Sequence, residues 1–475
     1  MKSAKKFTAN EIYALAFGLF LGLCILKFGN PVILDHNIFP PETLSDYWSD
    51  AWPIHWANWF FVPFAAIGAI LIALSAGTSP PRRYSPWLWF LPLLWLGWQM
   101  ISAIKTVDSN LTTATLWQFS GCVACYFIGL LLFRSPRALP LLLAGIITAY
   151  AICLIHAVQQ HVEFPRSAKL LIEGQQNGWT NLPPDFIEEM RRDNTIINTN
   201  GVDVVNPALL SRFAKNRVMG TLVYPNALAG IILLLFPVSF VLVYNGTKKL
   251  RPIVHLSAVG VTVLLSALAF VWSGSKFGWL LAMLMGALCL FRLGWPLKLK
   301  ILALVMVTVL GLGIFAIRFH SYFANGATST TARFDYWNAA VQTVRSNPFF
   351  GSGPGTFQRP YEQLKSPQAE MARLTHNDYL EQYSDSGVSG GLIYTAWIIA
   401  VLFFIGRNVW KSSNQIIVVV FLGLLGWFIQ GIGEFELYIP ALAWMAFTLL
   451  GWALSSANAE ERPVPESIRQ KPRQS

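Results

Sequence analysis

The chain contains few charged residues. Only 12% of its 475 residues are Asp, Glu, Lys or Arg, whereas 54% are hydrophobic, and a soluble domain usually carries about 25% charged residues. This deficit excludes an ordinary soluble domain and indicates a protein that crosses a membrane many times. The formal net charge of +11 would suit a nucleic-acid partner, but the positions of the basic residues explain it without one, so we expect no nucleic acid.

Cysteine is scarce as well. All five cysteines fall inside apolar stretches, at Cys24, Cys122, Cys125, Cys153 and Cys289, so the chain offers no disulfide framework outside the membrane. The pair Cys122 and Cys125 lacks a second pair of ligands, which favours ordinary helix packing over a metal site. Internal repeats are also absent, which argues against a repeat architecture.

Long apolar runs, by contrast, are abundant, and a stretch of about 20 apolar residues can cross a bilayer as a helix. Such stretches lie near residues 9–28, 55–77, 86–104, 114–133, 138–158, 220–244, 253–272, 277–291, 301–319, 388–406, 415–433 and 438–455. The sequence therefore predicts an all-α integral membrane protein with about twelve transmembrane helices.

Basic residues occur mainly in every second short connection between these stretches. They are Lys2, Lys5, Lys6, Arg82, Arg83, Arg134, Arg137, Lys248, Lys249, Arg251, Arg292, Lys298, Lys300, Arg407, Lys411, Arg462, Arg469, Lys471 and Arg473. The opposite short connections hold only Lys105 and Lys276. Because cytoplasmic loops are enriched in Lys and Arg, this distribution predicts that both termini are cytoplasmic.

Two long polar segments divide the chain on the predicted non-cytoplasmic side. The expected divisions are transmembrane helices 1–5 within 1–158, a first long loop at 159–219, helices 6–9 within 220–319, a second long loop at 320–387, helices 10–12 within 388–455 and a disordered cytoplasmic tail at 456–475. In the first loop the run "PPDFIEEMRRD" predicts a short helix. That loop either covers an active site or selects an acceptor.

The second long loop opens with a predicted amphipathic helix. Its apolar residues recur at helical spacing, at Phe334, Trp337, Val341 and Val344. The helix should end at Asn347, because proline at position 348 disfavours helical geometry in the residue before it. The glycine-rich run "GSGPG" at 351–355 follows a helix and not a strand, so it favours a hinge between two loop helices over a dinucleotide-binding turn.

The segment "THNDYLEQYSDSGVSGG" follows. Thr375 and Asp378 have the spacing of a capping box, with Thr375 as N-cap, and Gly387 is a plausible end of the helix. His376 would then be the first helical residue, where the helix dipole favours a neutral imidazole that can act as a base. A histidine that only hydrogen-bonds within a loop is the alternative. Asn377, Asp378 or Glu381 could orient the imidazole.

Several of these motifs together resemble a known family. The order "RVMGTLVYPNALAG" (217–230), "SGSKFGWLLA" (273–282), "RFDYW…NPFFGSGPGTF…THNDYLEQYSDSGVSGG" (333–391) and "GEFELYIPALA" (433–443) is similar to that of the O-antigen ligase and polymerase superfamily of polytopic glycosyltransferases. The first five apolar stretches carry no matching motif. The resemblance implies a glycosyltransferase-C-like helical architecture whose two long loops are periplasmic.

The resemblance also implies an activity. Members transfer a glycan from an undecaprenyl-diphosphate carrier to a lipid A core, another glycan or a protein hydroxyl, at the periplasmic face of the bacterial inner membrane. They work without a metal ion, and no cofactor is expected. The chain contains no D-x-D motif, its closest form being Glu434-Phe435-Glu436, and preorganised cations can stabilise a leaving diphosphate instead.

Roles follow from the matched motifs. By resemblance, His376 is the general base, and Arg333 and Arg217 bind the diphosphate. The family usually has Ser-Arg-Gly where this chain has Ser275-Lys276-Phe277. Lys276 keeps the charge but loses the bidentate fork. The simpler alternatives are a snorkelling lysine and interfacial arginines. We assign supporting roles to Asn377, Asp378, Glu434 and Glu436.

The sequence leaves the acceptor open. An O-antigen ligase-like enzyme, a polysaccharide polymerase and a protein O-glycosyltransferase differ only in what receives the glycan. A twelve-helix transporter or lipid-carrier flippase is the alternative from another class. Transporters typically have related halves and charged helices near the membrane midplane, whereas here the ionisable residues cluster in the outer loops.

Overall fold

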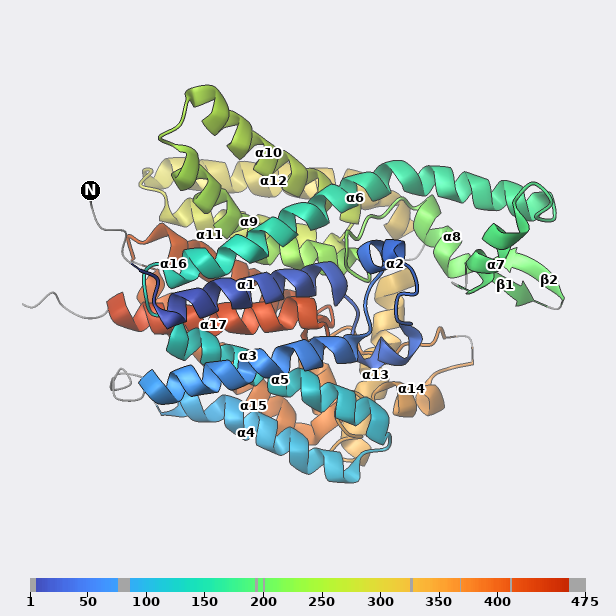
Figure 1. The fold of residues 1–475 in the computed structure, drawn as a ribbon, viewed down its shortest axis with the longest axis horizontal. Coiled ribbons are helices and arrows are strands. Elements are labelled where there is room, and N and C mark those ends of the chain that lie inside the picture. Colours follow the sequence, from blue (N-terminus) through green and yellow to red (C-terminus); the bar gives the residue numbers. More distant parts are fainter. Residues whose placement is uncertain are drawn as a thin grey trace, which may run out of the picture.

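The computed structural model describes residues 6–75, 86–192, 195–199, 201–324, 328–367, 369–410 and 412–460. Most of its long helices run in roughly one direction (Figure 1). The elements are α1 Ala9–Lys27, η1 Val32–Asn37, α2 Leu44–Ser49, α3 Ile54–Ser75, α4 Trp87–Ser102, η2 Ala103–Lys105, α5 Ser109–Leu132, α6 Ala138–Gln176, α7 Pro184–Arg192, β1 Ile196–Thr199, β2 Val202–Val205, α8 Pro207–Ala214, α9 Pro225–Thr247, α10 Pro252–Ser273, α11 Lys276–Arg292, α12 Leu297–Ala324, α13 Thr328–Ser346, α14 Gln358–Leu364, α15 Asp378–Val409, α16 Gln415–Gln430, η3 Glu436–Tyr438 and α17 Pro440–Glu460.

The helical architecture agrees with the sequence. Each predicted apolar stretch overlaps one helix, and ten helices are long and apolar enough to cross a membrane within the described part of the chain. Helices α11 and α16 fall short of that length, so a count of twelve spans stays a prediction. The strands seen in the described residues, β1 and β2, form one short antiparallel hairpin.

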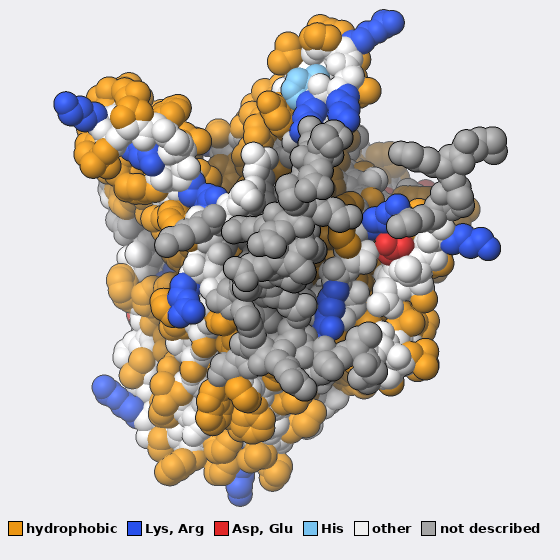
Figure 2. Space-filling model, turned by 90° about the vertical axis from the view of Figure 1, so that its left-hand side faces the viewer, with side chains coloured by type: hydrophobic (Ala, Val, Ile, Leu, Met, Phe, Trp, Pro, Cys, Tyr) orange, Lys and Arg blue, Asp and Glu red, His pale blue; other side chains and the backbone are white. Residues whose placement is uncertain are grey.

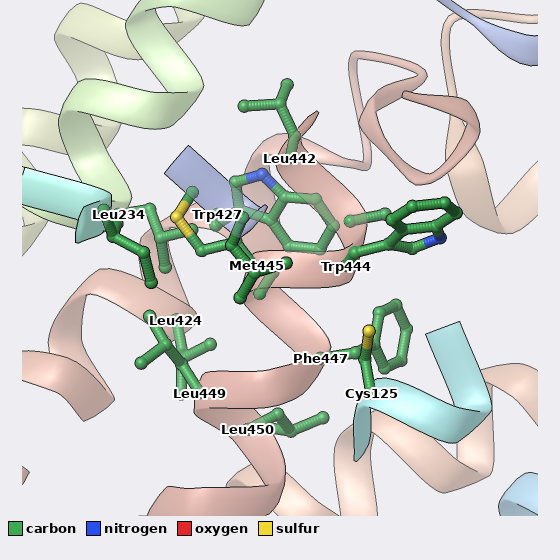
Figure 3. Close-up of a cluster of buried hydrophobic side chains, with 14 of the residues drawn as sticks. Cys125, Leu234, Leu424, Trp427, Leu442, Trp444, Met445, Phe447, Leu449 and Leu450 are labelled. Carbon is green, nitrogen blue, oxygen red and sulfur yellow. The ribbon is translucent and has the colours of Figure 1, made fainter. Parts of the chain in front are cut away.

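Helix α17 lies at the centre of the bundle. Its apolar stretch is 89% buried, whereas that of α12 is 0% buried. The close approach of α17 to α5 depends on glycine. A Cβ on Gly451 would lie 2.0 Å from the Tyr126 carbonyl oxygen, and one on Gly129 would lie 2.0 Å from that of Thr448. Large apolar side chains, including Trp427, Trp444 and others, fill the remaining space around α17 (Figure 3). Small residues that let helices approach are typical of membrane bundles.

The two ends of the bundle differ. Helix α1 begins at one end, and α6 extends beyond the bundle at the other, where α7, β1, β2 and α8 gather (Figure 1). Helix α6 continues to Gln176, well past the predicted boundary at residue 158, because the polar residues that follow are mostly good helix formers. The short helix predicted from "PPDFIEEMRRD" is present as α7.

The end at which α1 begins is basic. Figure 2 shows Lys and Arg side chains spread over this face with little acidic surface. Lys6 precedes α1, and the other described basic residues of the predicted cytoplasmic connections lie at helix termini of this end, where α5 is joined to α6, α9 to α10, α11 to α12 and α15 to α16. The predicted residues outside the described ranges are Lys2, Lys5, Arg82, Arg83, Lys411, Arg462, Arg469, Lys471 and Arg473.

The predicted tail at 456–475 begins too early. Helix α17 continues to Glu460, because Ala and Glu, which close the helix, are strong helix formers. Residues 461–475 lie outside the described residues.

Candidate functional site

A cavity of about 500 Å³ lies at the end of the bundle opposite the one at which α1 begins. It forms where α9, α11 and α15 begin, α12 ends and α13 starts. Its lining includes Arg217, Lys276, Arg333, His376 and Glu434. The structure therefore brings together the histidine and all three cations that the sequence singled out, from segments far apart in the chain.

The carboxylate of Glu434 contacts two of these residues, His376 and Arg333, and its side chain is only 1% exposed. Its Oε1 accepts hydrogen bonds from Arg333 Nη2 at 2.6 Å and Asn226 Nδ2 at 2.7 Å. Its Oε2 accepts one from the Tyr224 hydroxyl at 2.6 Å and lies 3.3 Å from His376 Nδ1. One buried carboxylate thus links the histidine to an arginine.

Glu434 is held in the ionised form. Burial alone would raise the pKa of this carboxyl, but the hydrogen bond to His376 and the positive charge of Arg333 outweigh burial and hold the pKa below its usual value. A buried carboxylate with several donors is the expected way to make such a charge tolerable. Glu434 therefore carries a negative charge at neutral pH.

Arg217 is fixed by two hydrogen bonds. Its Nε donates to the Ser273 carbonyl at 2.8 Å, and its Nη2 donates to Asn226 Oδ1 at 2.9 Å. Its side chain lies against Gly274, which has a φ of +61° and where an added Cβ would lie 3.1 Å from Arg217 Nε. Asn226 therefore bridges Arg217 and Glu434.

Lys276 is the first residue of α11 and lies just before the predicted span 277–291. Its ammonium lies 3.8 Å from the ring centroid of Tyr322 and 5.4 Å from that of Phe319. Burial, together with the positive charges of Arg217 and Arg333, lowers the pKa of Lys276 to about 8. Lys276 therefore loses its proton at a lower pH than an ordinary lysine, because of burial and of the neighbouring cations.

The backbone at His376 differs from the prediction. The N-cap of α15 is Asn377, whose side chain accepts a hydrogen bond from Leu380 N at 2.9 Å, and not Thr375. His376 therefore precedes the helix and adopts a left-handed φ of +53°. Asn is at least as good a cap as Thr. The partner of His376 is the Glu434 carboxylate, not the first turn of a helix.

Aromatic rings surround His376. Its ring centroid lies 4.7 Å from that of Phe435, 6.0 Å from that of Tyr336 and 6.4 Å from that of Tyr224. The side chain of His376 is 28% exposed, so the imidazole is enclosed but reachable from the cavity.

The four supporting residues have different positions. Asn377 caps α15, and the carboxylate of Asp378 accepts from Leu437 N at 3.3 and 3.2 Å, while Asp378 N donates to the Glu434 carbonyl at 3.1 Å. Asp378 thereby anchors the segment that carries Glu434. Glu436 does not line the cavity; it is buried against Gly230, and burial raises its pKa.

None of the neighbours suggested to orient the imidazole is the one in contact with it. That contact is made by Glu434, which the sequence indicated only as a supporting residue. Tyr224 and Asn226, which hold Glu434, were missed, although both lie in the quoted run "RVMGTLVYPNALAG". Within the described residues no group of three or more His, Cys, Asp or Glu could hold a metal ion.

The loop helices and the glycine turn have the expected order. Helix α13 ends at Ser346, before Pro348, and the turn leads to α14. Gly351, Gly353 and Gly355 have φ values of 63°, 108° and 73°. Their backbone packs closely on Ser384, Thr106 and Thr115 respectively, which leaves no room for a Cβ. Gly387, with a φ of 70°, interrupts α15, after which the helix resumes.

Fold and site together define a polytopic helical membrane protein with a cationic cavity at one end of its bundle. Residues 261–395 match the family model described as O-antigen ligase. This match confirms the resemblance to the O-antigen ligase and polymerase superfamily, and it includes Lys276, Arg333 and His376 but neither Arg217 nor Glu434.

A curated relative is an uncharacterized protein of Haemophilus influenzae. It is 26% identical to this chain over 188 residues, which cover 35% of this chain and 47% of the relative. The chain thus matches about half the length of that relative.

Proposed function

We propose that this protein is a metal-independent membrane glycosyltransferase of the O-antigen ligase type. It would transfer a glycan from an undecaprenyl-diphosphate carrier to an acceptor hydroxyl on the periplasmic face of the bacterial inner membrane. The observation that carries the proposal is the shared cavity, in which three cations and a carboxylate-bonded histidine lie together.

The cations suit a diphosphate leaving group. Breaking the glycosidic bond leaves the electron pair on a phosphate oxygen, and positive groups fixed in advance stabilise that charge most effectively. Arg333 and Arg217 offer planar donor forks for phosphate oxygens, while Lys276 supplies a point charge. Glu434 and Asn226 hold the two arginines in place without filling the cavity.

The histidine suits proton removal from the acceptor. Because a carboxylate only accepts hydrogen bonds, we assign the proton of the neutral imidazole to Nδ1, facing Glu434, which leaves Nε2 as the base. In the transfer step Nε2 takes the hydroxyl proton, the acceptor oxygen bonds to the anomeric carbon, and the bond from that carbon to the phosphate oxygen breaks. Glu434 stabilises the imidazolium that forms.

The side of the membrane follows from the two ends of the molecule. The basic end, with α1 at its beginning, would face the cytoplasm, and the cavity would face the periplasm. The segment from the outer part of α6 through α8 would cover the cavity or select the acceptor. A ligase, a polymerase and a protein O-glycosyltransferase remain distinguished by that acceptor alone.

The test is a transfer assay with purified protein, an undecaprenyl-diphosphate-linked glycan and three acceptors: a lipid A core, a second lipid-linked glycan and a hydroxyl-bearing peptide. Wild type should transfer the glycan to one of them, whereas Arg333→Ala and His376→Ala should transfer it far more slowly. His255→Ala is the control, since His255 bonds Thr247 away from the cavity. Movement of the carrier across vesicles without transfer would instead support a flippase, and loss of transfer on chelation would contradict metal independence.

A further inference from the structure

Two carboxyl groups are buried below the cavity, in the first segment of α15. Glu381 and Asp385 are both 0% exposed. They are four residues apart on a helix that is interrupted just after them at Ser386 and Gly387, so their side chains lie on the same face. Neither lines the cavity, and the proposed reaction uses neither directly.

Each carboxyl group has one bonded and one unbonded oxygen. Glu381 Oε2 accepts a hydrogen bond from Thr375 N at 2.5 Å, and Asp385 Oδ2 accepts from Gly355 N at 2.6 Å and from the Tyr438 hydroxyl at 2.8 Å. Glu381 Oε1 and Asp385 Oδ1 have no partner among the described residues. A single proton between these two oxygens would satisfy both.

The surroundings favour that proton. Two carboxylates one helical turn apart repel each other, and burial disfavours the charged form of each. No described Lys, Arg or His bonds to either group. The neighbours are neutral: Gln382 Nε2 donates to the Tyr438 hydroxyl at 3.0 Å, and Gln99 Nε2 donates to Gln382 Oε1 at 2.9 Å. The site therefore provides fixed donors for one negative charge but no cation for a second.

The pair is joined to the backbone that presents His376. Thr375, whose N–H bonds to Glu381, directly precedes His376, and its carbonyl accepts from Trp337 Nε1 at 3.1 Å. His376 holds a left-handed φ of +53°, a conformation that non-glycine residues adopt only when their surroundings impose it. The Glu381 hydrogen bond holds the residue directly before His376.

We propose that Glu381 and Asp385 share one buried proton and that this pair is the positioning device for His376. Asp385 fixes the glycine turn, the shared proton fixes Glu381 against Asp385, and Glu381 fixes the turn at Thr375. The pair acts on the base and not on the diphosphate cations, so it affects turnover and leaves donor affinity unchanged. The positioning role depends on the proposed function, whereas the shared proton does not.

Amide substitutions test the shared proton. In Glu381→Gln the amide oxygen accepts from Thr375 N and the NH₂ group donates to Asp385. In Asp385→Asn the amide oxygen accepts from Gly355 N and the Tyr438 hydroxyl, and the NH₂ group donates to Glu381. Each single variant should keep its unfolding temperature and turnover close to wild type. In the double variant Glu381→Gln/Asp385→Asn two NH₂ groups face each other, so unfolding temperature and turnover should fall far more than the single effects combined.

Removing the acceptor tests the positioning role. Glu381→Met keeps the side-chain length but cannot accept from Thr375, and turnover should fall by about 100-fold, as displacements near 1 Å can cause, with an unchanged Michaelis constant for the donor. Glu381→Gln should restore turnover. Glu362→Gln, in an exposed part of α14, is the control and should match wild type.

The outcomes of these experiments test the shared proton and the positioning role separately. Single amide variants that unfold, or a double variant no worse than the singles, would overturn the shared proton. A Glu381→Met enzyme with normal turnover, a raised Michaelis constant or no folded protein would overturn the positioning role. If His376→Ala is fully active, the proposed function fails, yet the unfolding temperatures of the amide variants still test the proton.

Discussion

The two ends of the bundle both carry basic residues, but they hold them differently. At the end where α1 begins, Lys248, Lys249 and Lys298 are exposed. Arg292 caps the end of α15 by donating to the Val409 carbonyl at 3.2 Å, and it also donates to the Ser412 carbonyl at 2.6 Å. At the cavity, Arg333 is 20% exposed and paired with a carboxylate that is 1% exposed.

The difference shows how burial changes the use of a charge. Exposed cations are screened by water and salt, so each one contributes little by itself and their sum favours one orientation in the membrane. Partly buried cations interact strongly with a nearby anion, because the effective dielectric constant there is low. They also need a partner when no ligand is bound, and Glu434 and Asn226 supply it.

The largest expected difference between the ends concerns histidine. His376→Ala should lower turnover about 1000-fold, within the range of general-base contributions, with normal folding in detergent. His255→Ala, which removes a histidine at the basic end, should leave turnover unchanged. Turnover is measured by glycan transfer. Equal losses of turnover in the two variants would show that the histidine at the cavity has no special role.

Arginine gives the next test. Arg333→Ala should reduce the specificity constant for the donor by about 100-fold or more, because a fixed charge on the leaving group is lost, and Arg333→Lys should recover part of that loss. Arg292→Ala should reduce stability by about 1 to 3 kcal/mol through the lost carbonyl contacts without changing the specificity constant. A kinetic defect in Arg292→Ala would contradict the assignment.

Substitution of Glu434 tests whether its carboxylate supports the reaction. Glu434→Gln should lower turnover by about tenfold to 100-fold, because the imidazolium loses its stabilising charge, while the neutral amide leaves Arg333 without an ion pair. Since the pKa of Glu434 is lowered in the folded protein, its contribution to stability is lost only as the pH falls through that low value. An acid unfolding midpoint identical in both proteins would show that this pair contributes nothing.

Lys276 offers a smaller, pH-dependent effect. With a pKa of about 8, wild-type donor affinity should fall as the pH rises through 8, whereas Lys276→Arg should stay active above it. Between about pH 8 and the ordinary lysine pKa near 10.4, the unfolded chain binds a proton that the folded chain has lost, so this group makes stability rise with pH. Identical alkaline profiles would exclude Lys276 from the diphosphate site.

The smallest effect is expected at the basic surface. Lys298→Gln should change the free energy of unfolding by no more than about 0.5 kcal/mol, as is usual for exposed positions, and should leave transfer unchanged. Chemical denaturation and the transfer assay measure the two quantities. A large change in either would mean that the basic end also takes part in the reaction.

Some local structure was predictable and some was not. The C-terminal end of α13 and the break at Gly387 follow from proline and glycine, whose backbone limits act locally, although α15 resumes after the break and continues to Val409. The helix start at His376 was wrong by two residues, because Thr375 and Asn377 are both good caps and only packing chooses between them. The role of Glu434 could not be read from spacing, since its partners Tyr224, Arg333 and His376 come from three distant segments.

The sequence by itself determined the helical membrane class, the asymmetric distribution of basic residues and the residues suited to phosphate and proton chemistry. These depend on apolar run length and on residue type, which are local properties. Only the tertiary structure decided that Arg217, Lys276, Arg333 and His376 share one cavity, that Glu434 links His376 to Arg333, and that Glu381 and Asp385 are buried. Contacts between distant segments depend on how helices pack, and packing is a property of the whole bundle.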